Sequence, residues 1–343
     1  MASESPREDE IGFGWTLGTF LGFAVLVLAW APFWGVESIP FRALWGDVSN
    51  HTAADILWKL RIPRVCMAFL AGTALATSGM VFQAMFRNPL ATPFTLGVSS
   101  GASLGAAICI QFRWAFLVWG ISSVSLSAFG GAVATIVLVY AITARGRQGA
   151  STATMLLAGV AISFFFSSLI LFLQYISDFS RSFRMLRWVM GGLERIVDFH
   201  DVWNVFPFVV AGSLVVWYLT HELNLLTTGE EFAFSRGVNV QQTKLLLFFA
   251  VSLMVGAVVA ICGPIGFVGL MAPHICRQLV GSDHRHLFPI TWLFGGAFLV
   301  ICDTVARTVI APTELPVGIL TALLGGPFFL WLLLAHKREL GAF

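Results

Sequence analysis

Two ionisable residues lie deep in apolar sequence, Asp303 and Arg307, within a run that extends from Leu287 to Ile310. They are four positions apart and therefore share one side of a helix, where their side chains can form an ion pair. An ionisable residue inside a membrane span often marks a substrate or proton pathway, so Asp303 could couple transport to a proton gradient. We favour the alternative, in which the two residues form a self-neutralising pair near a helix end.

The other residues with reactive or metal-binding side chains form no catalytic pattern. His274 follows Pro273, and a lone histidine beside a helix break is more often a hydrogen-bonded structural residue than a metal ligand. The 5 cysteines include no CxxC pair, which favours small buried side chains over disulfides or a metal site. The sequence has no GK dipeptide, so it contains no GxxxxGK[ST] nucleotide loop. We therefore expect no metal and no cofactor on this chain, and any ATP that drives it must bind to another subunit.

The composition is typical of a helical membrane protein. Of 343 residues, 57% are hydrophobic and 11% are charged, whereas soluble domains carry about 25% charged residues. Apolar runs that can cross a hydrocarbon core of roughly 30 Å recur along the chain and predict an all-α polytopic fold with about ten transmembrane helices. The net charge of +2 gives no indication of nucleic-acid binding. We expect residues 1–10 to form a disordered tail and residues 11–338 to form a single transmembrane domain.

The first half of the chain holds one highly ordered set of features. Two basic residues, Arg61 and Arg64, precede a charge-free run of membrane-spanning length. Asn88 and Pro89 follow that run and should end its helix, because proline cannot continue it. Three glycines at four-residue intervals then share one face of a returning helix and let another backbone approach closely: Gly97, Gly101 and Gly105.

A first polar connection covers residues 178–201. Its arginines recur at three-residue intervals among apolar side chains, which predicts a short amphipathic helix at the membrane interface. Gly191 and Gly192 should stop that helix.

A second polar connection covers residues 221–243. Thr228 and Glu231 match a capping box, in which each side chain satisfies a free backbone amide at the start of a helix. Gly237 lies where a left-handed residue is expected after the helix end. The prediction is a short helix near Gly229 to Arg236 that lies outside the bilayer and exposes Glu230, Glu231 and Arg236.

Several long stretches resemble the permease subunits of ABC importers for iron–siderophore complexes, haem and vitamin B12. In chain order they are FRNPLATPFTLGVSSGASLG, GPIGFVGLMAPHICRQLVGSDHR, CDTVAR and ELPVGILTALLGGPFFLWLLL. With the basic pair at Arg61 and Arg64, the resemblance covers most of the chain from Leu57 onward. It implies a type II ABC importer permease fold in a homodimer or a pair of homologous subunits. It also implies two cytoplasmic ATPase subunits that bind ATP and magnesium, and a periplasmic substrate-binding protein.

The resemblance also implies an orientation in the membrane. The basic residues are split evenly between the two sides of the predicted topology, so they do not decide the orientation. In the family both termini are cytoplasmic, the protein lies among the lipids of the bacterial inner membrane, and segment 178–201 would be periplasmic.

Individual roles follow only where motifs match. In the family, arginines of the RxPR and DxxAR segments receive glutamates of the binding protein, which maps docking onto Arg61, Arg64 and Arg307. The cytoplasmic loop before the seventh span contacts the ATPase and maps onto six residues here: Thr228, Gly229, Glu230, Glu231, Arg236 and Gly237. Spans five and ten, with the segment around Gly191, resemble the family's pore-lining and gating elements.

The expected function is therefore the import of an iron chelate. An iron–siderophore is the first expectation for the substrate, with haem and vitamin B12 as alternatives. Two other classes stay open: an ion-coupled secondary transporter that uses Asp303, and an intramembrane enzyme, which the absence of a catalytic pair disfavours.

Overall fold

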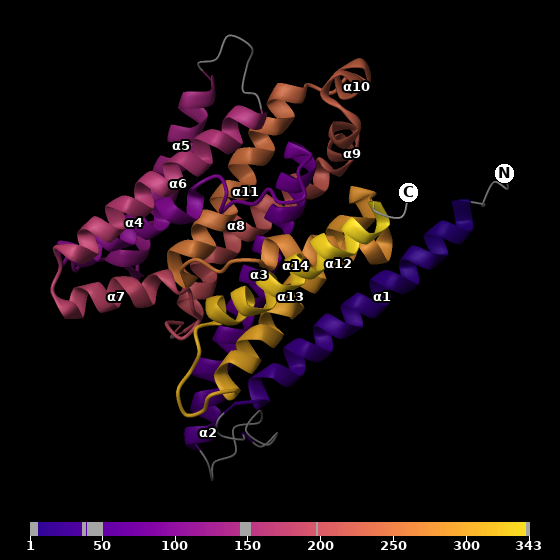
Figure 1. Ribbon diagram of the computed structural model, residues 1–343. Helices are drawn as coiled ribbons and strands as arrows, with labels where there is room; N and C mark the ends of the chain where they lie inside the picture. Colours follow the sequence, from indigo (N-terminus) through magenta and orange to yellow (C-terminus); the bar gives the residue numbers. More distant parts are fainter. Residues whose placement is uncertain (1–5, 36–38, 40–50, 145–151, 197, 341–343) are drawn as a thin grey trace.

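The computed structural model describes residues 6–35, 39, 51–144, 152–196 and 198–340 (Figure 1). Within them, 7 helices are long and apolar enough to cross a membrane. They are α1 (Pro6–Trp30), α3 (Ile62–Phe86), α5 (Ser123–Ala144), α6 (Thr152–Tyr175), α8 (Phe199–Tyr218), α11 (Val240–Cys262) and α13 (His284–Thr308). Three further helices run among them: α4 (Val98–Gln111), α12 (Val268–Val280) and α14 (Val317–Leu340). The prediction of an all-α membrane fold with about ten helices is confirmed.

Short elements connect these helices. They are the 3-10 turn η1 (Ala31–Phe33), α2 (His51–Asp55), the π-helical turn η3 (Ile56–Arg61), strands β1 (Leu117–Val118) and β2 (Ile121–Ser122), α7 (Phe179–Val189), α9 (Thr220–Thr228) and α10 (Glu230–Ser235). The two strands pair antiparallel, and Val118 lies opposite Ile121. Trp119 and Gly120 both adopt positive φ, as the central residues of a tight hairpin turn do.

Helix α3 lies at the centre of the bundle (Figure 1) and is buried along nearly its whole length. Glycines allow its backbone to lie directly against two later helices. A Cβ on Gly72 would overlap the carbonyl of Gly295 on α13, and a Cβ on Gly79 would overlap the carbonyl of Gly269 on α12. Such close backbone contact is the usual means by which membrane helices associate, since lipid supplies no hydrophobic drive between them.

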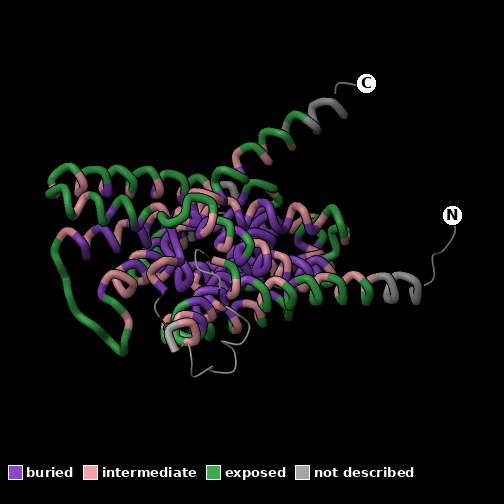
Figure 2. The backbone as a smooth tube through the Cα atoms, turned by 90° about the horizontal axis from the view of Figure 1, so that it is seen from below, coloured by how far each residue is buried: buried purple, intermediate pink, exposed green. Residues whose placement is uncertain are grey.

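The bundle has two distinct ends. Helices α9 and α10 lie at the upper right of Figure 1, together with both chain termini, and we call this the α10 end. Helices α2 and α7 lie at the opposite, lower-left end, which we call the α2 end. The end of α14 nearest the C-terminus extends away from the body of the molecule (Figure 2).

Two expected boundaries differ from the structure. Helix α1 begins at Pro6, inside the segment 1–10 that we expected to be a disordered tail; residues 1–5 lie outside the described part of the chain. The connection 221–243 is mostly helical, because α8 is followed at once by α9 and then by α10. The amphipathic helix expected in segment 178–201 is present as α7, and it ends just before Gly191, whose φ is +64°.

Candidate functional sites at the two ends of the bundle

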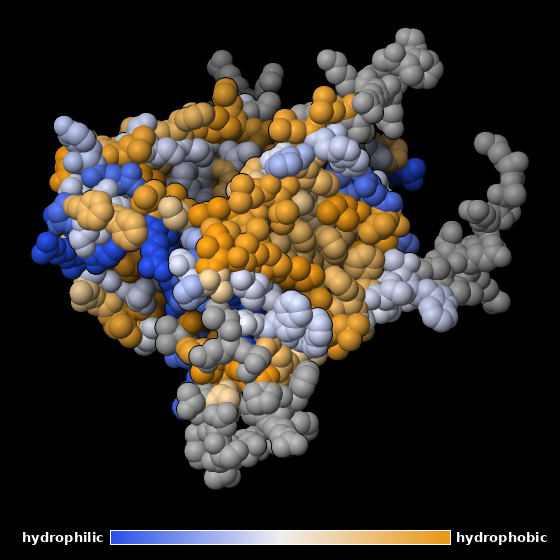
Figure 3. Space-filling view, turned by 60° about the horizontal axis from the view of Figure 1, so that its bottom comes forward, coloured by the Kyte–Doolittle hydropathy of each residue, from blue (hydrophilic) through white to orange (hydrophobic). Residues whose placement is uncertain are grey.

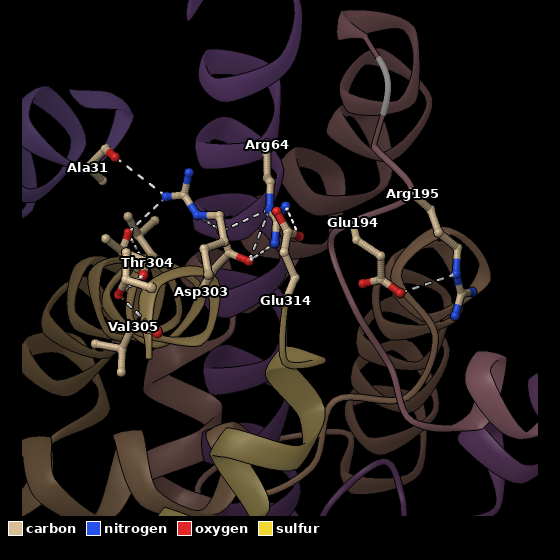
Figure 4. Close-up of polar contacts among 11 residues, drawn as sticks. Ala31, Arg64, Glu194, Arg195, Asp303, Thr304, Val305 and Glu314 are labelled. Atoms are coloured by element: carbon tan, nitrogen blue, oxygen red, sulfur yellow. Dashed lines mark hydrogen bonds and ion pairs between the residues drawn. The ribbon is translucent and has the colours of Figure 1, made fainter. Parts of the chain in front are cut away.

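Three charged residues that the sequence singled out, Asp303, Arg307 and Arg64, lie close together at the α2 end. Asp303 and Arg307 lie on the last turns of α13, and Arg64 lies on the first turn of α3. Helices α3 and α13 are held together by the glycine contacts described above, which brings the two sequence-distant segments side by side. Glu314, in the connection between α13 and α14, joins the same group (Figure 4).

Asp303 is the centre of this charge network. Its side chain is 1% exposed and accepts hydrogen bonds from Arg64 Nε at 3.2 Å to Oδ1 and 3.1 Å to Oδ2, and from Arg64 Nη2 at 2.9 Å to Oδ1. A guanidinium that meets a carboxylate in this forked arrangement is among the strongest polar pairs in proteins. A buried carboxylate without such partners would carry a large desolvation cost.

Arg307 completes the inner part of the network. Its Nε lies 3.2 Å from Asp303 Oδ2, which is an ion-pair distance, although the N–H is not aimed well enough for a hydrogen bond. Its Nη2 donates to Thr304 Oγ1 at 3.1 Å and to the carbonyl of Ala31 at 3.4 Å. The predicted pairing of Asp303 with Arg307 is therefore confirmed, and the structure adds Arg64 as a third member.

The outer members of the network lie closer to the surface. Arg64 Nη1 donates to Glu314 Oε2 at 2.7 Å, and the Glu314 side chain is 39% exposed. Arg61 Nη1 donates to the carbonyls of Pro32 at 3.1 Å and Phe33 at 3.3 Å, so it binds the same turn that Arg307 contacts. The three arginines onto which the resemblance maps docking are thus gathered in one place, and all three are buried.

Sequence analysis missed the pairing of Arg64 with Asp303 and with Glu314. Both pairs join residues more than 200 positions apart in the chain, at separations of 239 and 250. The one available signal was the presence of a lone acidic residue in the Pro/Gly turn that follows Arg307.

The short helix at the other end is built differently from the prediction. The capping box is wrong, because Thr228 is the last residue of α9 and its hydroxyl donates to the carbonyl of Leu225 at 2.8 Å. Gly229 precedes α10 with φ +145°, a conformation that favours glycine. The chain therefore reverses direction at a glycine between two helices, and no side chain caps the start of α10.

The end of α10 agrees with the prediction. Gly237 has φ +85°, and its N–H donates to the carbonyl of Phe234 at 3.0 Å. The N–H of Val238 donates to the carbonyl of Ala233 at 3.1 Å, and these two side chains belong to one small buried cluster. This pattern is a Schellman motif with its accompanying hydrophobic contact.

The charged residues of α10 fall into two groups. Glu231 and Arg236 are exposed, as predicted. Glu230 is half-buried and lies 2.5 Å from Lys244 Nζ, which ties α10 to the start of α11. Arg236 lies over the ring of Phe232, with its guanidinium carbon 5.3 Å from the ring centroid.

The predicted turn and glycine ladder are both present. Helix α3 ends at Arg87, which has φ +47°, and Asn88 Oδ1 accepts from the N–H of Leu90 at 2.9 Å just beyond. At Gly101 and Gly105 of α4, an added Cβ would overlap backbone carbonyls of α5. Gly97 has φ +82° and precedes α4, so its role is in the turn as well as in packing. Pro89 lies in the turn itself, as expected.

A backbone junction connects the segment after α7 with the end of α11 and the first turn of α14. The N–H of Gly192 donates to the carbonyl of Cys262 at 2.8 Å, and the N–H of Gly318 donates to the carbonyl of Gly191 at 3.1 Å. A Cβ on Gly191 would overlap the carbonyl of Pro264, which precedes α12. Sequence analysis singled out Gly191 as part of a gating segment but did not predict its partners.

Helix α7 borders a cavity of about 890 Å³ at the α2 end, which has both charged and apolar side chains in its lining. The lining includes three arginines and three acidic residues: Arg184, Arg187, Arg195, Glu194, Asp198 and Asp201. The helix itself is capped by Asp178, and the hydrogen bond from the backbone N–H of Arg181 helps to hold the pKa of Asp178 below its usual value. Positive and negative charges balance in the lining, so the cavity shows no preference for ions of one sign.

The candidate metal and redox residues form no site within the described residues. His274 Nε2 lies 3.2 Å from Gln278 Nε2 and its ring packs edge-on against Phe328. All five cysteines are free thiols, and Cys66 is the one that is not fully buried. Over the part of the chain that the structure describes, no group of three metal-binding side chains is found.

Comparisons with known proteins were made for the whole chain. Residues 23–335 match the model of the FecCD transport family. The hemin transport system permease protein HmuU of Yersinia pestis is 39% identical over 94% of this chain and 96% of its own length. The cobalamin import system permease protein BtuC of Halobacterium salinarum is 42% identical over 90% of this chain and 81% of its own length.

A solved structure shares the arrangement of helices. It is an inward-facing conformation of a metal-chelate type ABC transporter, with a TM-score of 0.81 and 31% sequence identity, and the match covers 94% of this chain and 99% of that one. The ten-helix bundle observed here is thus the type II ABC importer permease fold. The family match and the full-length relatives agree, and the chain belongs to the FecCD transport family.

Proposed function

We propose that this chain is the membrane permease of an ATP-driven importer that carries a large metal chelate into the cytoplasm. The observation that carries the proposal is the placement of the two candidate sites at opposite ends of one bundle. The charge network of Arg61, Arg64 and Arg307 lies at the α2 end, and α9 and α10 lie at the other (Figure 1). An importer needs this polarity, because the binding protein and the ATPase act from opposite sides of the membrane.

The α10 end is the proposed cytoplasmic face. Both termini lie toward this end of the bundle (Figure 1), which is consistent with the orientation implied by the sequence resemblance. A helix that transmits force must be stiff at its boundaries. The Schellman motif at Gly237 and the ion pair from Glu230 to Lys244 supply such boundaries, while Glu231 and Arg236 stay exposed for contact with an ATPase.

A second copy of the chain is proposed to complete the pathway. Helix α14 extends away from the body of the molecule and exposes large apolar side chains, including Leu323 at 63%, Leu330 at 64% and Trp331 at 62%. A broad hydrophobic area is also visible on the surface in Figure 3. A polar chelate cannot cross hydrocarbon, so we place its route between two copies, with α14 and α6 beside it and lipid around the outside.

We place the chain in the bacterial inner membrane and propose an iron chelate as its substrate. The sequence resemblance put an iron–siderophore first. Two of the relatives above are named for hemin and cobalamin. Uptake of haem and of cobalamin is therefore measured alongside uptake of a ferric siderophore.

Transport in vesicles tests the proposal directly. The permease is reconstituted with the ATPase and binding protein of its own host, and uptake of haem, ferric siderophore and cobalamin is compared in the presence of ATP. We expect ATP-dependent uptake of one chelate, abolished when the ATPase is inactivated. Uptake that persists with the inactive ATPase and follows the proton gradient would instead indicate a carrier that uses Asp303.

Docking of the binding protein needs its own test. Reversing Arg64 or Arg307 to glutamate would place a second carboxylate beside Asp303, so glutamine variants are preferable. We expect Arg61→Gln and Arg307→Gln to weaken docking to the permease–ATPase complex. The control is Lys59→Gln at the same end, where the lysine side chain is 70% exposed. Equal docking by all three variants would contradict the assigned role of the arginines.

A further inference from the structure

Glu314 occupies a position on Arg64 that a partner's carboxylate would need. The Arg64 guanidinium has two acidic partners. Its Nε and Nη2 donate to Asp303, and its Nη1 donates to Glu314 at 2.7 Å. Asp303 is 1% exposed and cannot be reached from outside, whereas the Glu314 side chain is 39% exposed. An incoming carboxylate can therefore compete for Arg64 only at the place that Glu314 holds.

The charges of the network make the same point. Arg64 and Arg307 are matched one for one by Asp303 and Glu314. Arg61 lies near Arg307 in the same network, and with Glu314 in place the negative charge of its carboxylate lowers the attraction that these arginines exert on an approaching carboxylate. When Glu314 moves away, Arg64 loses one of its two carboxylate partners. The negative charge of Glu314 then no longer repels the carboxylate of the binding protein.

The Arg64–Glu314 pair is suited to exchange. The Glu314 carboxylate is 39% exposed, so water can solvate it when it leaves, while Arg64, at 11% exposed, keeps Asp303 as its partner. The inner pair to Asp303 is buried, and breaking it would leave an uncompensated charge. A docking partner can thus replace Glu314 without disturbing the contacts that hold α3 against α13.

Glu314 also lies at the start of α14. The next residue, Leu315, donates its N–H to the carbonyl of Ala306 at 3.1 Å, and Val317 is 1% exposed. Gly318 then donates to the carbonyl of Gly191 in the backbone junction. The Glu314 carboxylate is therefore the side-chain tie that fixes the connection 309–316, and through it the first turn of α14, to α3.

We propose that Glu314 is an internal competitor for the docking carboxylate and a latch on the α13–α14 connection. A carboxylate of the substrate-binding protein displaces Glu314 from Arg64, and the freed connection lets the start of α14 move. The exchange is non-covalent and leaves every group in its original charge state. This inference rests on the proposed function, because it takes the binding protein as the source of the carboxylate.

The first experiment measures the affinity of the permease–ATPase complex in nanodiscs for its own binding protein. We expect Glu314→Gln to bind about three- to tenfold more tightly than wild type, since the competitor is weakened. Asp55→Asn is the matched control, because it removes one negative charge from an exposed pair with Lys59 at the same end. Equal affinity of the two variants would overturn the competitor role.

A third variant separates contact from charge. Glu314→Asp keeps the negative charge but shortens the side chain by one methylene, so its carboxylate no longer reaches Arg64 Nη1. We expect its affinity to lie above that of wild type and below that of Glu314→Gln. If Glu314→Asp binds as weakly as wild type, general repulsion explains the effect and the specific competition for Arg64 is wrong.

A second measurement needs no partner protein. Hydrogen exchange of the Leu315 amide is followed in the permease alone, where we expect at least threefold faster exchange in Glu314→Gln than in Asp55→Asn. Unchanged exchange overturns the latch whether or not a binding protein docks. If the wild-type permease–ATPase complex does not bind the substrate-binding protein, the proposed function is wrong. The hydrogen exchange of the Leu315 amide still shows whether Glu314 acts as a latch.

Discussion

Replacing Asp303 with asparagine tests whether the charge network holds the α2 end of the bundle together. Asparagine has nearly the same shape as aspartate but no charge. In wild type, the Asp303 carboxylate accepts three hydrogen bonds from Arg64 and lies 3.2 Å from Arg307 Nε. In Asp303→Asn the two buried guanidiniums repel each other across a neutral amide, which can satisfy only part of their donors.

The expected cost follows from the burial of the site. Removing one partner from a buried ion pair typically destabilises a protein by about 3–5 kcal/mol. An unfolding entropy of roughly 2.1 cal/mol/K per residue, taken over 343 residues, is about 0.7 kcal/mol/K. We therefore expect the melting temperature of Asp303→Asn to fall by about 4–7 °C.

The assay is thermal melting of the detergent-purified permease, followed by size-exclusion chromatography. Asp55→Asn serves as the control, because its side chain is 61% exposed and its ion pair should contribute at most about 1 kcal/mol. A further variant replaces Arg64, Asp303 and Arg307 together with Met, Leu and Met, and should melt above Asp303→Asn, because no buried charge is left unpaired and Glu314, which loses Arg64, is 39% exposed and can be solvated. A melting temperature of Asp303→Asn within 1 °C of wild type would refute the reasoning.

Three other predictions concern separate parts of the chain. Gly237→Pro should abolish transport while the ATPase still assembles, because proline cannot adopt the φ of +85° found there; normal uptake would contradict the lever role of α10. Gly101→Ala should lower the melting temperature by an amount equivalent to about 1–3 kcal/mol, because its Cβ would overlap Thr135. Gly130→Ala on α5 has open space and should melt like wild type. The cap of α7 should be lost as the pH falls below about 4. The hydrogen bond from the Arg181 N–H depresses the pKa of Asp178 in the folded state, so the stability that this bond contributes is lost when the Asp178 carboxylate is protonated. Hydrogen exchange of α7 should show this pH dependence in wild type and lack it in Asp178→Asn, where the side chain still caps the helix but does not titrate.

The sequence predicted the helices well because their causes are local. A run of apolar residues must form a helix in lipid, since each backbone amide has to be satisfied within the segment. The turn at Asn88 and the left-handed residue at Gly237 were likewise predicted from neighbouring residues and are present. The same local logic failed at Thr228, because α9 continues through that residue and uses its hydroxyl within the helix.

The site at the α2 end depended on contacts that no local pattern encodes. The pairing of Asp303 with Arg307 follows from helix geometry and could be predicted. Whether Arg64 faced a partner protein or the interior depended on how α3 packs against α13, which is set by glycine contacts such as Gly72 with Gly295. Motif resemblance singled out Arg61, Arg64 and Arg307, whose role in docking stays a prediction, and the structure adds that Asp303 and Glu314 both pair with Arg64.

The attachment of α14 suggests how a signal could cross the bundle. At its start the helix is held by the Gly318–Gly191 hydrogen bond and by the Glu314–Arg64 pair, both at the α2 end. Farther along it extends away from the body, with Trp331 exposed (Figure 2). The middle of α14 also packs against α12, where the ring of Phe328 meets His274, so a change at the start of the helix acts first on the connection 309–316 and the first turn. We infer that the proposed docking site acts on this first turn of α14, and that α10 acts on the rest of the bundle through α11, to which Glu230 and Lys244 attach it.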